Sequence, residues 1–588
     1  MANSRAFRSK SLALRLLNRT GVGGLIGKFS FDPQEPLSRS ALDQMIDDSQ
    51  GPATSRDFVT APGIALGVHG RRTSIAALEQ PLLRVAANTA ITNAAAIRAE
   101  LSACDHAFDT ASDAELILRA YARWSIGCFG RLRGPFACAL WDAAARRLVL
   151  ARDQIGIRPL HFAVLPNQGV LFASDIRSVI SHPDMSREWC PDAIDTYLAF
   201  GYVPAPLTAF RRITSLEPAH VLIVEGRRLH IERYWDVPAP QSLRLDDALE
   251  RGRQDVRRVI DDQASRADES LLYSGGLGST TLLACAAQPL SPVLTVDFGL
   301  DGAERARTER AANHLGYSTE RVEPEPIAAG LVRELAAHFD QPVADPRAVT
   351  QLALCRAARQ RTDSACTATG ATALWSQRPS QPRQHLDEHC RHALYTRAFA
   401  WQVRDSDPFA RQTELLEGVV PPDPPARARY VDAHTRLPGS EIVIAERAAA
   451  AAGLELRYPL LDPILVASAA AIRAQLTSRR AGTSALQLLL SPLVPRNLLP
   501  SPKNRPAAGW LAAALLPLVP GTLLSARFDS RDIVSRPTLR RLWEEHASGR
   551  RDHGGLLWSL LMLELWFRHR VDNDASDEPE EYAVRRAA

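Results

Sequence analysis

A glycine-rich stretch, "LLYSGGLGSTTLLA" at residues 271–284, contains residue types that could hold a phosphate group. Glycines let the backbone approach an anion closely, and hydroxyls and amide N–H groups at a helix N-terminus can donate hydrogen bonds to its oxygens. The candidate nucleotide-binding residues are Ser274, Gly275, Gly276, Leu277, Gly278, Ser279 and Thr280. The loop has no lysine, which excludes the GxxxxGK[ST] motif, and no carboxylate that could hold a magnesium ion.

The sequence around this loop has the pattern of a parallel sheet. "ESLLYSGG" predicts a buried strand, and a helix, the strand "PVLTVDFG" and a further helix containing "AERARTERAANHLG" follow it. This alternation is typical of βαβ units. Ligands of such sheets bind beyond the carboxyl ends of the strands, which is where the loop is expected. Beyond residue 330 the chain is predicted to be largely helical, with loops at 376–385 and 419–429.

The chain is long enough for more than one domain, and its pattern changes along its length. Short strands with turn signals, and helical stretches such as "DAELILRAYARW", predict a layered α+β domain in the N-terminal part. The predicted segments are a basic extension or mis-assigned start (1–21), this α+β domain (22–235), a Pro-containing linker (236–247), a parallel-sheet domain with a large helical part (248–570) and a polar disordered tail (571–588).

Composition argues against several classes of function. The 70 basic and 66 acidic residues leave a net charge of +4 over 588 residues, which gives no footprint for nucleic-acid binding. No apolar run reaches the ~18 residues that span a bilayer, so no membrane partner is expected. The eight cysteines are scattered, without a CxxC pair or a histidine at ligand spacing. This distribution favours reduced thiols in the cytoplasm over disulfides or zinc.

An ordered set of motifs resembles the asparagine synthetase superfamily. "RLRGPFACALWDAAARRLVLARDQIGIRPLHF" (131–162) resembles the end of a class II glutamine amidotransferase domain, and "YVPAPLTAF" followed by "SLEPAHVLIVEGRRLHIERYW" resembles the junction into the synthetase domain. "SGGLGST" resembles the SGGxDS pyrophosphate loop, and "GLELRYPLLDPILV" (453–466) and "LLWSLLMLELWFR" (556–568) also match. The resemblance implies an ATP-pyrophosphatase-type fold for the second domain, with ATP and Mg²⁺ as cofactors. It also implies two half-reactions, which are glutamine hydrolysis and adenylation of a carboxylate for attack by an amine.

The residues that the family uses for glutamine hydrolysis are altered. The family nucleophile is an N-terminal cysteine, and the alignment of "VGGLIG" places Gly23 at that position, so no nucleophile is expected. The family's Asn-Gly-Glu-Ile-Tyr-Asn segment aligns with "NTAITN", which puts Thr89 and Ala90 where the family has glycine and glutamate. Arg72 and Asp113 stand at positions resembling substrate contacts, but fold-supporting salt bridges are the better interpretation of both. We expect no glutaminase activity.

The residues for adenylation are partly retained. Lys503 in "SPKNRP" stands where the family has a lysine that resembles a charge-stabilising catalytic residue. Glu455, Arg457 and Asp462 match the family's "ExRxPxxD" pattern and are interpreted as wall and scaffold residues. The family's metal-binding acids are absent at Gly278 and in "TGATALW" (369–375), so the metal ligands are unknown; Asp345 is an acid that the sequence does not place.

Three hypotheses follow. The first is an ATP-dependent, AMP- and pyrophosphate-forming C–N ligase similar to lasso-peptide cyclases, which would close a macrolactam in a precursor peptide with a leader peptidase as a second partner. The second is an asparagine synthetase-type enzyme whose partner is a small carboxylate substrate, aspartate, and which uses ammonia. Adding aspartate and ammonia with ATP would reveal this reaction. The third is a non-catalytic scaffold that binds a peptide, which the missing acids favour.

Overall fold

The computed structural model describes residues 23–35, 37–47, 56–104, 107–237, 243–263, 270–286, 290–296, 302–322, 329–376, 386–417, 424–476, 484–499 and 517–573. The chain forms two compact units. Unit 1 comprises Met1–Ser186, Arg212–Val237 and Ala450–Gly453, and unit 2 comprises Arg187–Arg211, Pro238–Ala449 and Leu454–Ala588. The predicted basic segment 1–21 lies outside the described residues, and so does the predicted tail 571–588 from residue 574 onward.

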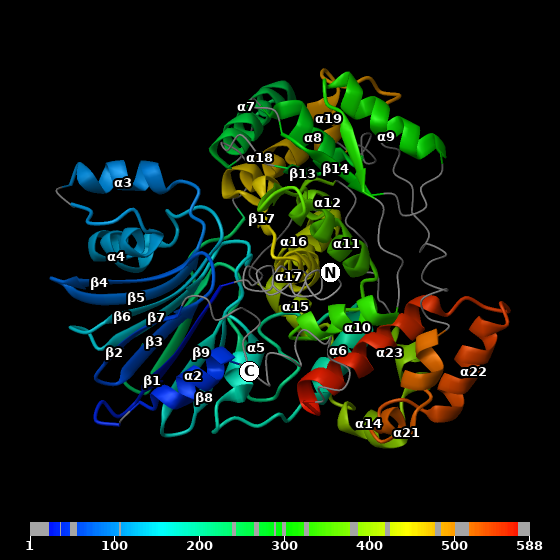
Figure 1. The fold of residues 1–588 in the computed structure, drawn as a ribbon, viewed down its shortest axis with the longest axis horizontal. Coiled ribbons are helices and arrows are strands. Elements are labelled where there is room, and N and C mark those ends of the chain that lie inside the picture. The colour runs from blue at the N-terminus through cyan, green and yellow to red at the C-terminus, as the bar shows by residue number, and fades with distance from the viewer. Residues whose placement is uncertain are drawn as a thin grey trace, which may run out of the picture. The chain divides into compact units, whose positions relative to one another are not determined.

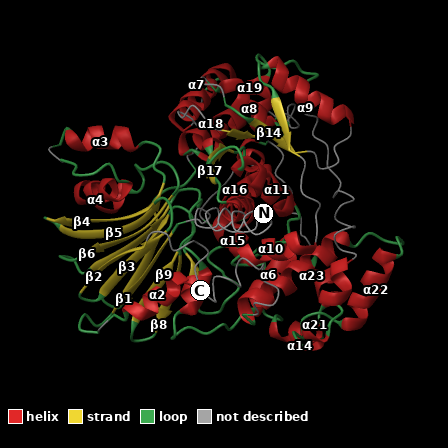
Figure 2. Cartoon of the chain, viewed as in Figure 1, coloured by secondary structure: helices red, strands yellow, loops and turns green. Residues whose placement is uncertain are grey.

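Unit 1 is built on two antiparallel sheets of six strands each (Figures 1 and 2). The strands are β1 (Gly24–Ser30), β2 (Arg56–Ala61), β3 (Ile64–His69), β4 (Thr73–Glu79), β5 (Leu82–Thr89), β6 (Phe136–Asp142), β7 (Arg147–Arg152), β8 (His161–Leu165), β9 (Gly169–Ala173), β10 (Thr214–Ser215), β11 (His220–Glu225) and β12 (Arg228–Arg233). One sheet has the order β10-β8-β9-β1-β3-β2, and the other has the order β12-β11-β7-β6-β5-β4.

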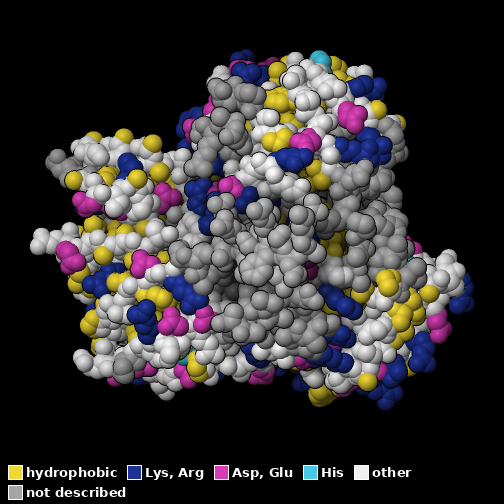
Figure 3. Space-filling view, in the orientation of Figure 1, with side chains coloured by type: hydrophobic (Ala, Val, Ile, Leu, Met, Phe, Trp, Pro, Cys, Tyr) yellow, Lys and Arg dark blue, Asp and Glu magenta, His cyan; other side chains and the backbone are white. Residues whose placement is uncertain are grey.

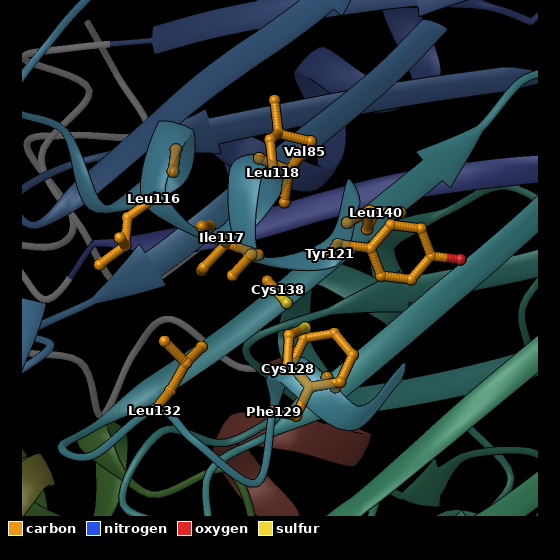
Figure 4. Close-up of a cluster of buried hydrophobic side chains, with 14 of the residues drawn as sticks. Val85, Leu116, Ile117, Leu118, Tyr121, Cys128, Phe129, Leu132, Cys138 and Leu140 are labelled. Atoms are coloured by element: carbon orange, nitrogen blue, oxygen red, sulfur yellow. The ribbon is translucent and has the colours of Figure 1, made fainter. Parts of the chain in front are cut away.

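The two sheets of unit 1 enclose one core, and helices cover the outer faces. Phe29 and Phe172 of the first sheet pack with Trp141 and Leu150 of the second, and all four are buried. The helices are α2 (Arg39–Asp47), α3 (Ala94–Ser102), α4 (Asp113–Trp124) and α5 (Ile176–Ser181). Figure 4 shows the second core, where side chains of α4 lie against those of β5 and β6.

The sequence "SDAE" explains where α4 begins. The Ser112 hydroxyl accepts a hydrogen bond from the Glu115 amide at 3.2 Å, which is the serine half of a capping box. The Glu115 carboxylate accepts hydrogen bonds from the amides of Asp109 and Thr110 instead. The cap therefore fixes both the helix start and the loop before it.

Unit 2 contains a parallel sheet and many helices. Its strands are β13 (Ser270–Leu272), β14 (Val293–Val296), β15 (Thr319–Val322), β16 (Ser364–Cys366) and β17 (Glu455–Arg457). They pair in parallel in the order β15-β14-β13-β16-β17, so β13 is the central strand. The helices are α6 (Pro191–Phe200), α7 (Leu245–Gln263), α8 (Leu277–Cys285), α9 (Gly302–His314), α10 (Ala329–His338), α11 (Arg347–Arg359), α12 (Ala371–Trp375), α13 (Glu388–Leu394), α14 (Arg397–Gln402), α15 (Ala410–Leu416), α16 (Pro424–His434), α17 (Ile442–Ala452), α18 (Pro463–Ala474), α19 (Ala485–Leu490), α21 (Ala526–Asp529), α22 (Arg536–Ala547) and α23 (Gly554–Trp566).

The predicted fold class is confirmed: a layered α+β part precedes a parallel-sheet part with a large helical region. One local prediction was wrong, because the expected loop at 419–429 already contains the start of α16 at Pro424. Proline is tolerated in the first helical turn, where the backbone N–H has no partner within the helix. Residues 187–211, inside the predicted 22–235 segment, pack with unit 2.

Basic and acidic side chains of the described residues are interspersed over the face in Figure 3. Among the described residues, none of the helices combines the length and apolar character needed to cross a membrane.

Candidate functional site

The candidate phosphate-binding loop leaves the central strand of the parallel sheet of unit 2. Strand β13 is buried and pairs with β14 and β16, so the loop starts at the carboxyl edge of the sheet. Helix α8 begins directly after it, with Gly276 as the residue before the first helical position. The first N–H groups of a helix have no partner within the helix, and they can therefore donate to an anion.

The glycines and hydroxyls of this loop hold its shape. Gly275 has a φ of +66°, and an added Cβ would lie 2.6 Å from Thr308 Cγ2 of α9. Only glycine fits both the conformation and the space. The Ser274 and Ser279 hydroxyls lie 3.3 Å apart, and the Ser279 hydroxyl donates to the Gly276 carbonyl at 3.2 Å. Of the predicted residues 274–280, residues 274–276 form the turn, with Ser274 exposed, and residues 277–280 are the first residues of α8.

Helix α8 packs closely against the segment that corresponds to the second acidic motif of the family. An added Cβ on Gly278 would lie 2.5 Å from Ala371 Cβ, 3.0 Å from Ala368 Cβ and 3.3 Å from Leu460 Cδ1. Ala371 is the first residue of α12, and the preceding Gly370 has a φ of +81°. Methyl groups therefore occupy the space beside position 278.

The residues around the loop do not fit a protein-bound magnesium ion. Mg²⁺ requires oxygen ligands at about 2.0–2.1 Å, usually including a carboxylate. Among the described residues, no group of three or more His, Cys, Asp or Glu side chains is placed to hold a metal ion. Magnesium therefore stays a prediction from the resemblance.

Asp345 forms an ion pair with Arg347. The sequence alone did not show where this acid lies. Its carboxylate accepts hydrogen bonds from the Arg347 backbone N–H at 2.9 Å and from Arg347 Nε at 2.8 and 3.0 Å. Burial alone would raise the pKa of Asp345, but the charge and hydrogen bonds of Arg347 lower it below the usual value. Asp345 therefore stays ionised within an ion pair with Arg347.

The other predicted residues of this half have different roles or lie elsewhere. Asp462 is buried and caps α18, accepting a hydrogen bond from the Ile464 N–H at 3.0 Å. The Arg457 side chain donates to the Gln263 carbonyl. Lys503 lies outside the described residues, so its catalytic role stays a prediction. Thr308, which fixes the loop glycine, was missed by sequence reasoning because it stands on the next helix without any motif.

Position 23, where the family has its nucleophile, is closed in unit 1. An added Cβ on Gly23 would overlap the Arg71 carbonyl oxygen and would lie 2.6 Å from Thr73 Cγ2. The Asn88 side chain donates a hydrogen bond to the Gly23 carbonyl, which holds the backbone in place. A cysteine side chain at this position would require a movement of the backbone.

Residues 88–93, which align with the family's glutamine pocket, donate backbone N–H hydrogen bonds to other parts of unit 1. The N–H of Thr89 donates to the Arg72 carbonyl at 2.9 Å, and the N–H of Ala90 donates to the Pro135 carbonyl at 2.8 Å. The Asp113 carboxylate accepts from the Ile91 N–H at 3.0 Å. Asp113 thus supports this segment through a backbone hydrogen bond, while Arg72 is exposed with a φ of +59°.

Two family models match the chain. A glutamine amidotransferase domain matches residues 22–235, and an asparagine synthase domain matches residues 255–568. A Mycobacterium tuberculosis protein whose name places it among the glutamine-hydrolysing asparagine synthetases is 29% identical over 529 residues, covering 78% of this chain and 80% of that protein. Asparagine synthetase [glutamine-hydrolyzing] 1 of Bacillus subtilis is 24% identical over 557 residues, covering 84% and 86% of the two chains. Because the asparagine synthase model matches more than half of the chain, the protein belongs to the asparagine synthase family.

Proposed function

We propose that this chain is an ATP-dependent amide-forming ligase that does not hydrolyse glutamine and takes its amine from the substrate itself. The observation that carries this proposal is the packing at Gly23, where the Arg71 carbonyl and Thr73 occupy the space of a nucleophilic side chain. Without a thiol at this position, the covalent route to ammonia is closed. The amine must then have another source, and in this proposal the substrate carries it.

The retained loop supports the activation half of the reaction. A substrate carboxylate oxygen attacks the α-phosphorus of ATP, the bond to the bridging oxygen breaks and pyrophosphate leaves. An amine then attacks the acyl carbon, AMP leaves with the bonding electrons, and the nitrogen loses a proton. The turn at residues 274–276 and the first residues of α8 are suited to hold the departing pyrophosphate through N–H groups and hydroxyls.

We propose a peptide as the substrate class, with an Asp or Glu side chain as acyl donor and the peptide's own N-terminal amine as nucleophile. This macrolactam reaction rests on the resemblance to lasso-peptide cyclases together with the loss at Gly23. An intramolecular amine needs no ammonia source, and its high effective concentration favours ring closure. A precursor peptide and a leader peptidase would be the partners.

The experiment combines ATP with a panel of peptides that carry a free N-terminus and one internal Asp or Glu. Expected products are AMP, pyrophosphate and a peptide lighter by one water, with no glutamate formed from glutamine. Gly275→Ala should abolish the reaction because its methyl group collides with Thr308, whereas Gly316→Ala is the matched control. Both glycines have positive φ values, but nothing lies within 4 Å of an added Cβ at Gly316. Amide formation from aspartate and ammonia instead would assign a free-ammonia synthetase.

A second candidate, a non-catalytic peptide-binding scaffold, is favoured by the methyl groups packed at Gly278. In that case a peptide binds while ATP is neither bound nor consumed. Calorimetry with ATP therefore separates the two candidates before any product is sought.

A further inference from the structure

Helix α8 leaves no room for a side chain at Gly278 on the side that faces α12. The side of α8 that faces α12 carries a hydrogen atom at Gly278, and the facing residue Ala371 carries only a methyl group. A Cβ added at position 278 would lie 2.5 Å from Ala371 Cβ, which is well below van der Waals contact. Ala368 Cβ and Leu460 Cδ1 would lie 3.0 and 3.3 Å from the same added Cβ. Gly278 and Leu460 are buried, whereas Ala368 and Ala371 are half-buried.

This arrangement and a divalent-cation site exclude each other. Two carboxylates that share one ion need room for two side chains and an ion with about 2 Å bonds between the backbones that carry them. The two segments here approach too closely to admit even one added Cβ without displacement. The loss of the acids is thus accompanied by closure of the space that they would fill.

We propose that Gly278 and Ala371 form a packing lock that replaces the metal site of the family. The loop then recognises a polyphosphate through its backbone N–H groups and hydroxyls alone. In the described part of the chain, no protein side chain beside the loop holds a divalent cation, so a divalent cation does not strengthen polyphosphate binding. The statement about polyphosphate rests on the proposed function, but the lock does not. It predicts that positions 278 and 371 are energetically coupled in the absence of any ligand.

A double-mutant cycle tests the lock without nucleotide. Gly278→Ala should lower the melting temperature, and the same change in an Ala371→Gly background should lower it by much less, because the colliding methyl group is gone. Gly330→Ala is the matched control, since nothing lies within 4 Å of an added Cβ there and it should lower nothing. Equal effects of Gly278→Ala in both backgrounds would overturn the lock.

Calorimetry with ATP in EDTA and in magnesium then tests polyphosphate recognition. The expected affinities agree within about threefold, and Gly275→Ala removes binding in both solutions. A tightening by magnesium of about tenfold or more, corresponding to about 1.4 kcal/mol, would overturn the metal-independent mode. Absence of binding in both solutions would overturn polyphosphate recognition and the proposed function together, while the cycle decides the lock separately.

Discussion

Restoring the family's cysteine at position 23 should destabilise unit 1 and should not create a glutaminase. The obstacle is the backbone carbonyl of Arg71, which cannot rotate aside as a flexible side chain would. The Asn88 hydrogen bond to the Gly23 carbonyl also resists a shift of the strand. Overpacking a closed site costs about 1–3 kcal/mol, and the backbone obstacle places Gly23→Cys near the upper value.

The assay is thermal unfolding of the full chain, followed by thiol and glutamate measurements. A loss of about 3 kcal/mol corresponds to a decrease of about 6–12 °C in the melting temperature for a unit of this size. Gly127→Cys is the matched control, because it adds the same side chain in unit 1 where nothing lies within 4 Å. An unchanged melting temperature for Gly23→Cys, or glutamate formed from glutamine, would refute the reasoning from packing.

Three further predictions concern the rest of the fold. Asp195 accepts hydrogen bonds from Arg391 Nε at 3.0 Å and from the Tyr395 hydroxyl at 2.5 Å. Asp195→Ala leaves the buried guanidinium without this carboxylate, so urea unfolding should show a loss of about 3–5 kcal/mol in the free energy of unfolding. A loss below about 1 kcal/mol would contradict a buried ion pair. Burial, and then the charge of Arg56, lowers the pKa of His69 from 6.5 to about 4. Between pH 6.5 and pH 4 the unfolded state binds a proton at His69 more readily than the folded state does. The free energy of unfolding is therefore not reduced by His69 above pH 6.5. About 3 kcal/mol is lost as the pH falls to 4, and His69→Phe should flatten that slope. Two of the eight cysteines, Cys104 and Cys390, are exposed, so a thiol reagent should modify two sites quickly in the native protein and eight after denaturation; a third fast site would contradict the structure.

The sequence predicted the order of the elements better than their contacts. The βαβ alternation and the glycine-rich turn before α8 follow from local pattern, because apolar runs and glycines act over a few residues. Helix α8 begins at Leu277, inside the candidate loop of residues 274–280. The sequence also showed that position 278 has no acidic residue. The sequence did not show that Ala368 and Ala371 fill the space beside Gly278. This contact joins segments about ninety positions apart and depends on how two helices dock.

Two other features also depend on contacts between separate segments of the chain. Thr308, on the next helix, leaves no room for a side chain at Gly275. The Arg71 carbonyl, in a turn after β3, leaves none at position 23. Neither contact can be predicted from the local sequence pattern. The start of α16 at Pro424 was assigned to a loop because prolines usually interrupt helices, although a first helical turn accepts them.

The path of residues 187–211 has a practical consequence for anyone who divides this protein. Within unit 2 the Tyr197 hydroxyl donates to the Ser559 carbonyl at 2.8 Å, and Phe210 packs on Trp566 with ring centroids 5.5 Å apart. A fragment cut at the linker would carry these aromatic rings away from their partners and expose them to water. Such a fragment should aggregate, and the two halves of the gene should not work when exchanged at that linker with those of a relative.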